Sequence, residues 1–214
     1  MNNKLIKSPY FFAVLGLILF FPAFLINLHY EPIGEDEAIR ALVAFEMDKS
    51  GDYSTPTIGG SHYMNKPPLY NWLVLGSYKL FGNYSEYAIR FPMVLALLLI
   101  STTIFFIIRR ELGLRLAVLN ALIFLTLGRV IIYESLIGNI DMAHSLLIYL
   151  FFMVVYFLFR KEKFLTLFIV AYLFTAATWM MKGLPSIVFL GTTLLVLFIS
   201  GKRFKLLFSW KHFA

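Results

Sequence analysis

The sequence lacks cysteine altogether and contains few charged residues. Only 14% of its 214 residues are charged, whereas 60% are hydrophobic and 23 are phenylalanine. Soluble domains carry about 25% charged residues, so this composition is typical of a protein embedded in a bilayer. The absence of cysteine excludes disulfides and thiolate metal sites, although it says nothing about the redox compartment.

The formal charge of +7 follows from membrane topology rather than from nucleic-acid binding. The basic residues cluster at the ends of apolar runs, as the positive-inside rule predicts for a membrane protein, so no nucleic-acid partner is expected. A spanning helix takes about 20 apolar residues. We expect six spans, at residues 10–28, 87–108, 116–133, 142–159, 164–181 and 184–199.

The predicted fold class is all-α, a polytopic bundle of transmembrane helices that forms a single membrane domain over residues 1–214. No soluble C-terminal domain is expected. The first apolar run follows Lys4 and Lys7 and is long enough to span, and no small-x-small cleavage site follows it. We therefore interpret it as an uncleaved anchor rather than a signal peptide.

The basic clusters also orient the bundle. They precede span one, separate spans two and three, separate spans four and five, and follow span six. With six spans all of them lie on one side, which the positive-inside rule makes cytoplasmic. The prediction is a multi-pass protein of the plasma (inner) membrane with a cytoplasmic N-terminus. Residues 29–86 then form a loop on the outer face.

This outer loop is predicted to contain two amphipathic helices that lie along the bilayer surface. The first begins with acids at Glu35, Asp36 and Glu37, and Gly51 is a suitable end. The second starts at Pro67-Pro68 and ends near Gly82. Its expected apolar face consists of Leu69, Trp72, Leu73, Gly76 and Leu80.

The acidic pair Asp36-Glu37 is the first candidate for chemistry. Eight of the twelve acids lie between Glu31 and Glu86, and a solvated loop that avoids the cytoplasmic side would account for most of them. This pair, however, lies where the chain leaves the bilayer and enters a surface helix. A carboxylate there can accept a proton from an attacking hydroxyl or amine, or help to hold a divalent cation.

Asp141 is the second acidic candidate, because it opens the fourth span. A favourable interaction with the helix dipole would explain it, but an ionisable group at membrane depth is by default a functional hypothesis. His144 lies one turn further on and is either a metal ligand with Asp141 or a histidine at a helix interface. A divalent cation is thus left open as a cofactor, with Asp141 and His144 as its candidate ligands.

Lys66 and Lys182 are the basic candidates, since a lysine can bind phosphate as a point charge. The alternative for both is snorkelling to the interface. Lys182 is predicted to face outward, where the positive-inside rule demands no lysine, so function is favoured there. Arg129 is a third candidate for phosphate. It lies five residues from Glu134, too far for an i,i+4 pair, so each could line the site or bridge to a neighbouring helix.

Several strings resemble the motifs of one family of membrane glycosyltransferases. Residues 35–56 are similar to the first-loop signature of enzymes that use lipid-phosphate sugars, and residues 63–72 (Tyr-Met-Asn-Lys-Pro-Pro-Leu-Tyr-Asn-Trp) to their second-loop motif. Residues 80–92 resemble the entry to the next span, Asp141 matches the acid that opens the fourth, and residues 181–183 resemble a Thr-Lys-Gly turn. The family comprises the bacterial lipid A aminoarabinose transferases and the protein mannosyltransferase-like group.

This resemblance covers nearly the whole chain and implies a GT-C fold. It also implies transfer of a sugar from a polyprenyl- or dolichyl-phosphate donor, among the membrane lipids, to lipid A, a glycan or a protein on the outer face. Asp36 would be the base or the carboxylate that orients the acceptor. Asn65 stands where the aminoarabinose transferases have glutamate, which weakens a metal site built on that residue. Family members run to several hundred residues, so this chain is expected to be a fragment or a minimal form.

Two other classes of function remain open from the sequence. A transporter or flippase for lipid-linked intermediates predicts broken helices and charges near the bilayer midplane. Most acids here lie in the outer loop instead, which favours surface chemistry. A non-catalytic membrane subunit is the third possibility, and the short length of the chain is compatible with it.

The predicted topology can be tested by labelling single cysteines, because the chain has none of its own. Ser61→Cys should react with an impermeant reagent in intact cells, whereas Leu114→Cys should react only after the cells are opened. Labelling of both positions in intact cells would contradict the topology.

Overall fold

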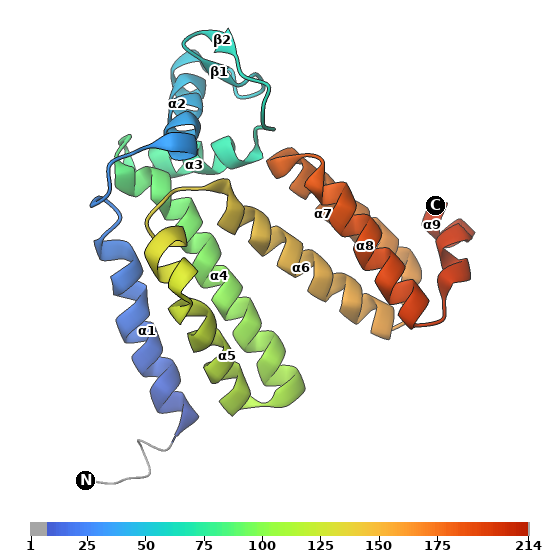
Figure 1. Cartoon of the computed structure of the whole chain (residues 1–214). Coiled ribbons are helices and arrows are strands. Elements are labelled where there is room, and N and C mark those ends of the chain that lie inside the picture. The colour runs from blue at the N-terminus through green and yellow to red at the C-terminus, as the bar shows by residue number, and fades with distance from the viewer. Residues whose placement is uncertain (1–7, 214) are drawn as a thin grey trace, which may run out of the picture.

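The computed structural model describes residues 8–213, which are almost entirely helical (Figure 1). Lys4 and Lys7, on which part of the predicted orientation rests, lie outside this range. In chain order the elements are α1 (Pro9–Ile26), α2 (Glu35–Ser50), β1 (Thr57–Ile58), β2 (Ser61–His62), α3 (Leu69–Phe81), α4 (Glu86–Leu112), α5 (Leu114–Thr126), η1 (Val130–Glu134), α6 (Ile140–Arg160), α7 (Phe164–Lys182), α8 (Pro185–Ser200), η2 (Phe204–Phe208) and α9 (Trp210–Phe213).

The long helices form two groups that extend to the same side of α2 and α3 (Figure 1). Helices α1, α4 and α5 pack together in the first group, and α6, α7 and α8 in the second. Helix α6 also contacts α4 and so joins the groups. The short antiparallel hairpin β1–β2, in which Thr57 pairs with His62, lies beyond α2. The predicted all-α bundle is confirmed.

Three helices in the described part of the chain, α4, α6 and α7, are long and apolar enough to cross a membrane. Shorter apolar helices cover Tyr10–Ile26, Leu114–Thr126 and Pro185–Ser200. Large apolar side chains such as Ile18, Leu173 and Val196 point outward and are exposed. A surface of this kind is unfavourable in water but favourable in hydrocarbon.

The predicted span at residues 116–133 is not one continuous helix. Helix α5 ends at Thr126, and Leu127 adopts an extended conformation with φ −57° and ψ 131°. Gly128 follows, and glycine is among the poorest helix formers. The chain then forms a single π-helical turn, η1. Such turns are rare and are found frequently at functional sites.

The two outer-loop helices end at the glycines that the sequence predicted. Gly51 ends α2 with φ +73°, and its N–H donates to the Met47 carbonyl. Gly82 ends α3 in the same way, with φ +67°. Both positions need the left-handed conformation that glycine adopts without strain. Ser85 caps α4 by accepting a hydrogen bond from the Ala88 N–H, as expected for an N-cap serine.

The face of α3 that packs against α2 and α4 is not the predicted apolar face of a bilayer-surface helix but another one. Tyr70, Val74 and Tyr78 are buried, whereas Trp72, Leu73 and Leu80 are exposed. The tyrosine hydroxyls make this burial possible, since Tyr70 donates to the Gly138 carbonyl and Tyr78 to the Ala41 carbonyl. Leu73 and Leu80 of the predicted apolar face lie outside the protein core.

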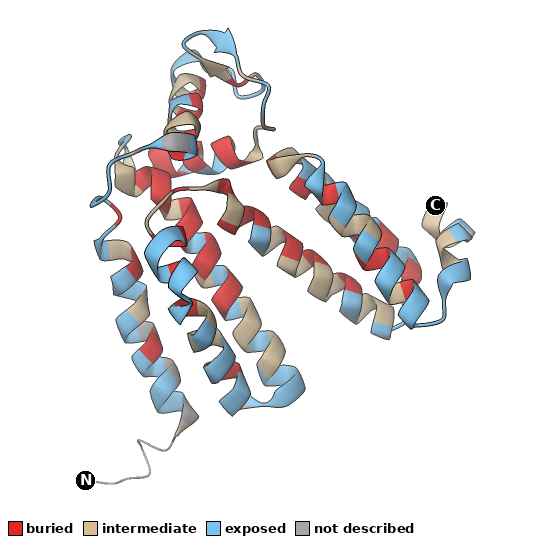
Figure 2. Ribbon diagram, in the orientation of Figure 1, coloured by how far each residue is buried: buried red, intermediate tan, exposed pale blue. Residues whose placement is uncertain are grey.

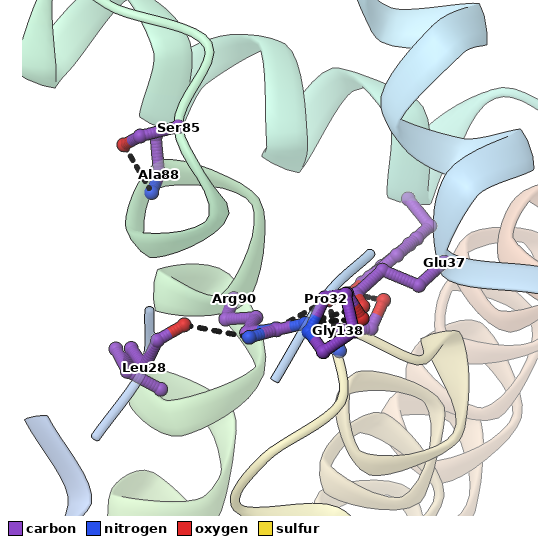
Figure 3. Close-up of polar contacts among 8 residues, drawn as sticks. Leu28, Pro32, Glu37, Ser85, Ala88, Arg90 and Gly138 are labelled. Atoms are coloured by element: carbon purple, nitrogen blue, oxygen red, sulfur yellow. Dashed lines mark hydrogen bonds and ion pairs between the residues drawn. The ribbon is translucent and has the colours of Figure 1, made fainter. Parts of the chain in front are cut away.

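A buried ion pair joins α2 to α4 beneath the outer loop (Figure 3). Arg90 binds Glu37 through two parallel hydrogen bonds, Nε to Oε1 at 2.7 Å and Nη2 to Oε2 at 2.8 Å. The side chain of Arg90 is 0% exposed and that of Glu37 is 1% exposed. This two-pronged geometry is the strongest arrangement available to an arginine and a carboxylate.

The same pair binds three backbone groups, at Leu28, Pro32 and Gly138. Arg90 Nη1 donates to the Leu28 carbonyl at 2.7 Å, and the Gly138 N–H donates to Glu37 Oε1 at 2.8 Å. Tyr70 donates to the carbonyl of the same glycine. Burial, and then the Glu37 charge, raises the pKa of Tyr70, so its hydroxyl remains a donor. Buried residues accordingly concentrate where α2, α3, α4 and the start of α6 meet (Figure 2).

Glu37→Gln should destabilise the protein, because it leaves the Arg90 charge buried without a counter-charge. The expected loss is about 3–5 kcal/mol in the free energy of unfolding. The matched control is the neighbouring Asp36→Asn, which is exposed and should change stability by less than about 0.5 kcal/mol. Thermal unfolding of both variants in detergent measures the difference, and equal midpoints would contradict the role assigned to the ion pair.

Candidate active site

Three further acids of the outer loop, Glu46, Asp48 and Asp52, have structural partners as Glu37 does. Glu46 accepts hydrogen bonds from Thr57 and from the Gly59 N–H, which fixes the hairpin to α2; the Thr57 hydrogen bond, more than any other contact, lowers the pKa of Glu46. Asp48 accepts from the Tyr84 hydroxyl at 2.6 Å. Asp52 accepts from Ser54 and Thr55, and the Ser54 hydroxyl contributes most to lowering the pKa of Asp52 to about 2. These carboxylates hold the loop in its conformation through their hydrogen bonds.

Asp36 is different, because it has no hydrogen bond or ion pair within residues 8–213. It is exposed in the first turn of α2, where the helix dipole favours a negative charge. Glu31 is similarly unengaged but belongs to no helix. Helical geometry turns adjacent residues about 100° apart, which explains how Glu37 enters the core while Asp36 faces outward.

The N-terminus of α2 lies beside the start of α6. Glu37 accepts the Gly138 N–H, and Gly138 is three residues before Asp141. Asp141 in turn binds Lys182 Nζ, which joins the first residues of α6 to the last residue of α7. The structure thus brings three predicted site residues, Glu37, Asp141 and Lys182, to one end of the bundle. The Lys182 charge is shared with Asp141.

A cavity of about 690 Å³ opens beside Asp141 and Lys182. Its lining combines polar side chains with apolar side chains from α4, α5 and α8. Its polar lining consists of Arg129, Glu134, Asp141, His144, Ser145, Tyr149 and Lys182. Its apolar wall includes Ile100, Ile104, Phe124 and Phe189. A cavity of this kind suits an amphiphile with a polar headgroup and a hydrocarbon tail.

Arg129 and Glu134 do pair, contrary to the expectation from their five-residue spacing. Arg129 Nε donates to Glu134 Oε1 at 2.8 Å. The π-helical turn η1 is the reason, because its wider register brings residues i and i+5 onto one face. Arg129 is 71% exposed, whereas Glu134 is buried. Arg129 therefore borders the cavity with its charge already balanced.

His144 also lines the cavity, one turn below Asp141. Its ring lies 6.1 Å from that of Phe189, between the centroids. Among the described residues, no group of three or more His, Cys, Asp or Glu side chains is arranged to hold a metal ion. Asp141 and His144 thus lack a third ligand of this type, and Asp141 already binds Lys182.

Lys66 and Arg40, both near the outer loop, have no carboxylate within reach among the residues that the structure describes. Lys66, partly buried just before α3, makes no hydrogen bond or ion pair there. Arg40 is 2% exposed, and its only hydrogen bond runs from Nη2 to the Tyr63 hydroxyl at 3.3 Å. Sequence reasoning missed Arg40 and Arg90 as site residues. The available signal for Arg40 was its position three residues after Glu37, on the core-facing side of α2.

Comparison with known structures defines the class of protein. The fold matches ArnT from Cupriavidus metallidurans, a GT-C membrane glycosyltransferase, with a TM-score of 0.77 in the apo state and 0.76 in the structure bound to undecaprenyl phosphate. In both comparisons 22% of residues are identical, and the match covers 93% of this chain and 37% of that one. The chain therefore has a GT-C fold and corresponds to the N-terminal, transmembrane region of ArnT.

Sequence comparison adds the family. Residues 65–214 match dolichyl-phosphate-mannose-protein mannosyltransferase, so the chain belongs to this family of multi-pass membrane glycosyltransferases. An undecaprenyl phosphate-α-4-amino-4-deoxy-L-arabinose arabinosyl transferase from Edwardsiella ictaluri is 35% identical over 58% of the chain. An uncharacterized protein from Aquifex aeolicus is 29% identical over 69% of it. The chain spans only 22% and 29% of the length of these two relatives, respectively.

Gly138 tests the arrangement at this end of the bundle. A Cβ at this position would lie 2.8 Å from Glu37 Oε1 and 3.3 Å from the Ile89 carbonyl. Gly138→Ala should therefore push the carboxylate away from Arg90 and cost about 1–3 kcal/mol, a typical cost of overpacking. The control Gly191→Ala meets open space inside α8 and should stabilise by up to about 1 kcal/mol. Equal thermal midpoints for the two variants would contradict this packing.

Proposed function

We propose that this chain forms the substrate-facing part of a glycosyltransferase that acts on the outer face of the membrane. The donor is a sugar linked to a polyprenyl or dolichyl phosphate, and the acceptor is a lipid, a glycan or a protein. Family membership supports this class of reaction. So do the arabinosyl transferase among the relatives and the ArnT structure bound to undecaprenyl phosphate.

The observation that carries the proposal is the meeting of three kinds of group at one end of the bundle. An unengaged carboxylate, Asp36, lies at the start of α2, and the cation Lys66 lies just before α3. The cavity beside Asp141 and Lys182 has a lining of both polar and apolar side chains. A lipid-linked sugar likewise combines a polar sugar, a charged phosphate and a hydrocarbon chain.

In the proposed reaction, an acceptor hydroxyl or amine attacks the anomeric carbon of the sugar. The bond from that carbon to the phosphate oxygen breaks, and the lipid phosphate leaves with the electron pair. Asp36 takes the proton of the attacking group as a general base. Lys66 and Lys182 stabilise the charge on the departing phosphate, and Asp141 holds Lys182 in position.

The distribution of charge disfavours the transporter alternative. A flippase would place ionisable groups near the bilayer midplane. The charged residues of α4, α6 and α7 lie instead within two turns of a helix end, with Arg90, Asp141 and Lys182 all at the end nearest α2. Chemistry at the membrane surface explains this placement better than passage through the membrane.

Asp36→Asn should lower the rate of sugar transfer by roughly 100-fold or more, as expected when a general base is lost. The substitution keeps the shape of the side chain and removes only its basicity. Transfer from a radiolabelled undecaprenyl-phosphate sugar in proteoliposomes measures the rate, with the full-length Edwardsiella ictaluri transferase as the positive control for the assay. Wild-type transfer by the variant would refute the assignment of Asp36.

Lys66→Ala and Lys182→Ala should each raise the KM for the donor. Loss of a charge-assisted contact costs about 1–3 kcal/mol, or roughly 5- to 150-fold. Lys79→Ala is the matched control, because Lys79 is an exposed lysine of α3 that binds Tyr53 and Asp48 in the outer loop. The same donor KM in all three variants would make Lys66 and Lys182 interfacial residues without a part in donor binding.

A further inference from the structure

Two buried polar atoms on the wall of the cavity have no hydrogen-bond partner among the described residues. They are Glu134 Oε2 and His144 Nε2. Glu134 is 4% exposed and His144 is 6% exposed. An unpaired buried polar atom costs free energy, and most such atoms in folded proteins are paired. Two of them on one cavity indicate a ligand that supplies hydrogen bonds.

The charge balance of the cavity decides which ligand chemistry fits. Each acid that lines it is already paired with a base, Glu134 with Arg129 and Asp141 with Lys182. The cavity is therefore close to neutral overall, whereas a phosphate needs an excess of positive charge. That excess lies elsewhere, at Lys66 and Arg40. A metal cation as ligand is equally disfavoured, because it would face the positive charges of Arg129 and Lys182.

A neutral ligand with several hydroxyl groups satisfies both observations. A hydroxyl can donate to Glu134 Oε2, and another can bind His144 Nε2 in either tautomer. Phe124, Tyr149 and Phe189 line the same cavity and offer apolar surfaces for the carbon skeleton of a ring. Small-molecule sites typically combine such surfaces with a few precisely placed polar groups.

We propose that Glu134 and His144 form the subsite for the sugar ring of the donor and determine which sugar is accepted. This inference rests on the proposed function and deepens it. The two residues bind hydroxyl groups of the sugar. The phosphate is bound outside this subsite by Lys66 and, at the edge of the subsite, by Lys182. The π-helical turn η1 is essential to the subsite, since it gives Arg129 and Glu134 their shared face and leaves the second carboxylate oxygen of Glu134 without a partner among the described residues.

Binding measurements in nanodiscs with two probes test the subsite. The probes are undecaprenyl phosphate and undecaprenyl phosphate mannose, which differ in the sugar and in the phosphate charge, since the first is a phosphate monoester and the second a diester. The wild-type chain should bind the sugar-bearing probe at least 10-fold more tightly. Glu134→Gln and His144→Phe should each remove most of this preference and leave the affinity for undecaprenyl phosphate within about two-fold of wild type, since a site that reads a hydroxyl loses selectivity when its partner is removed.

Two further variants separate recognition from folding. His144→Gln restores a hydrogen-bonding group and should recover part of the preference that His144→Phe loses. Arg129→Gln removes the partner of Glu134 without changing the free oxygen, so it should reduce the preference less than Glu134→Gln. Thermal midpoints of all four variants, measured in the same nanodiscs, show whether a variant has lost the preference because it is unfolded. If His144→Phe does not fold, His144→Gln is compared with the wild type instead.

The outcomes distinguish this inference from the proposed function. If the wild-type chain binds undecaprenyl phosphate but the folded variants keep the full preference for the sugar, the subsite is refuted and the proposed function survives. If the chain binds neither probe, the proposed function fails and the subsite fails with it. If EDTA abolishes the preference, the two atoms bind a metal ion, which also refutes a sugar subsite.

Discussion

The buried ion pair between Glu37 and Arg90 is the interaction on which the outer end of this protein depends. It is fully enclosed, and its two residues are 53 positions apart in the sequence. A charge at this depth is tolerated only with a partner and further hydrogen bonds, and the Leu28 carbonyl and the Gly138 N–H supply these. The pair thereby determines where α2, α4 and the segment before α6 meet.

The ion pair also explains how two adjacent acids can have different tasks. Glu37 is committed to Arg90, and this fixes the first turn of α2 against the bundle. Asp36 then projects from a rigid position into solvent, close to the start of α6. A general base must be held precisely but must remain free to accept a proton. In the proposed function, the first turn of α2 meets both conditions through neighbouring residues, and the cavity beside Asp141 and Lys182 is the proposed space for the substrate.

Features of this structure that depend on local chemistry could be read from the sequence, and those that depend on distant partners could not. Gly51, Gly82 and Ser85 mark helix ends because their conformational and capping preferences are local. The partner of Glu37 could not be deduced, because no pattern connects it to Arg90. The face of α3 that packs against the protein could not be predicted, since both of its faces are apolar and the choice depends on hydrogen bonds from Tyr70 and Tyr78. The Arg129–Glu134 pair was missed because a break at Leu127 changes the helical register.

A double-mutant cycle on the ion pair tests the central claim most directly. Unfolding is measured for the wild type, Glu37→Gln, Arg90→Met and the double variant in the same detergent. Each single variant leaves a buried charge without its partner, whereas the double variant leaves none. The account predicts that the double variant is more stable than the sum of the single losses allows, by at least about 2 kcal/mol. Additive losses would show that the two residues contribute independently and would contradict the account.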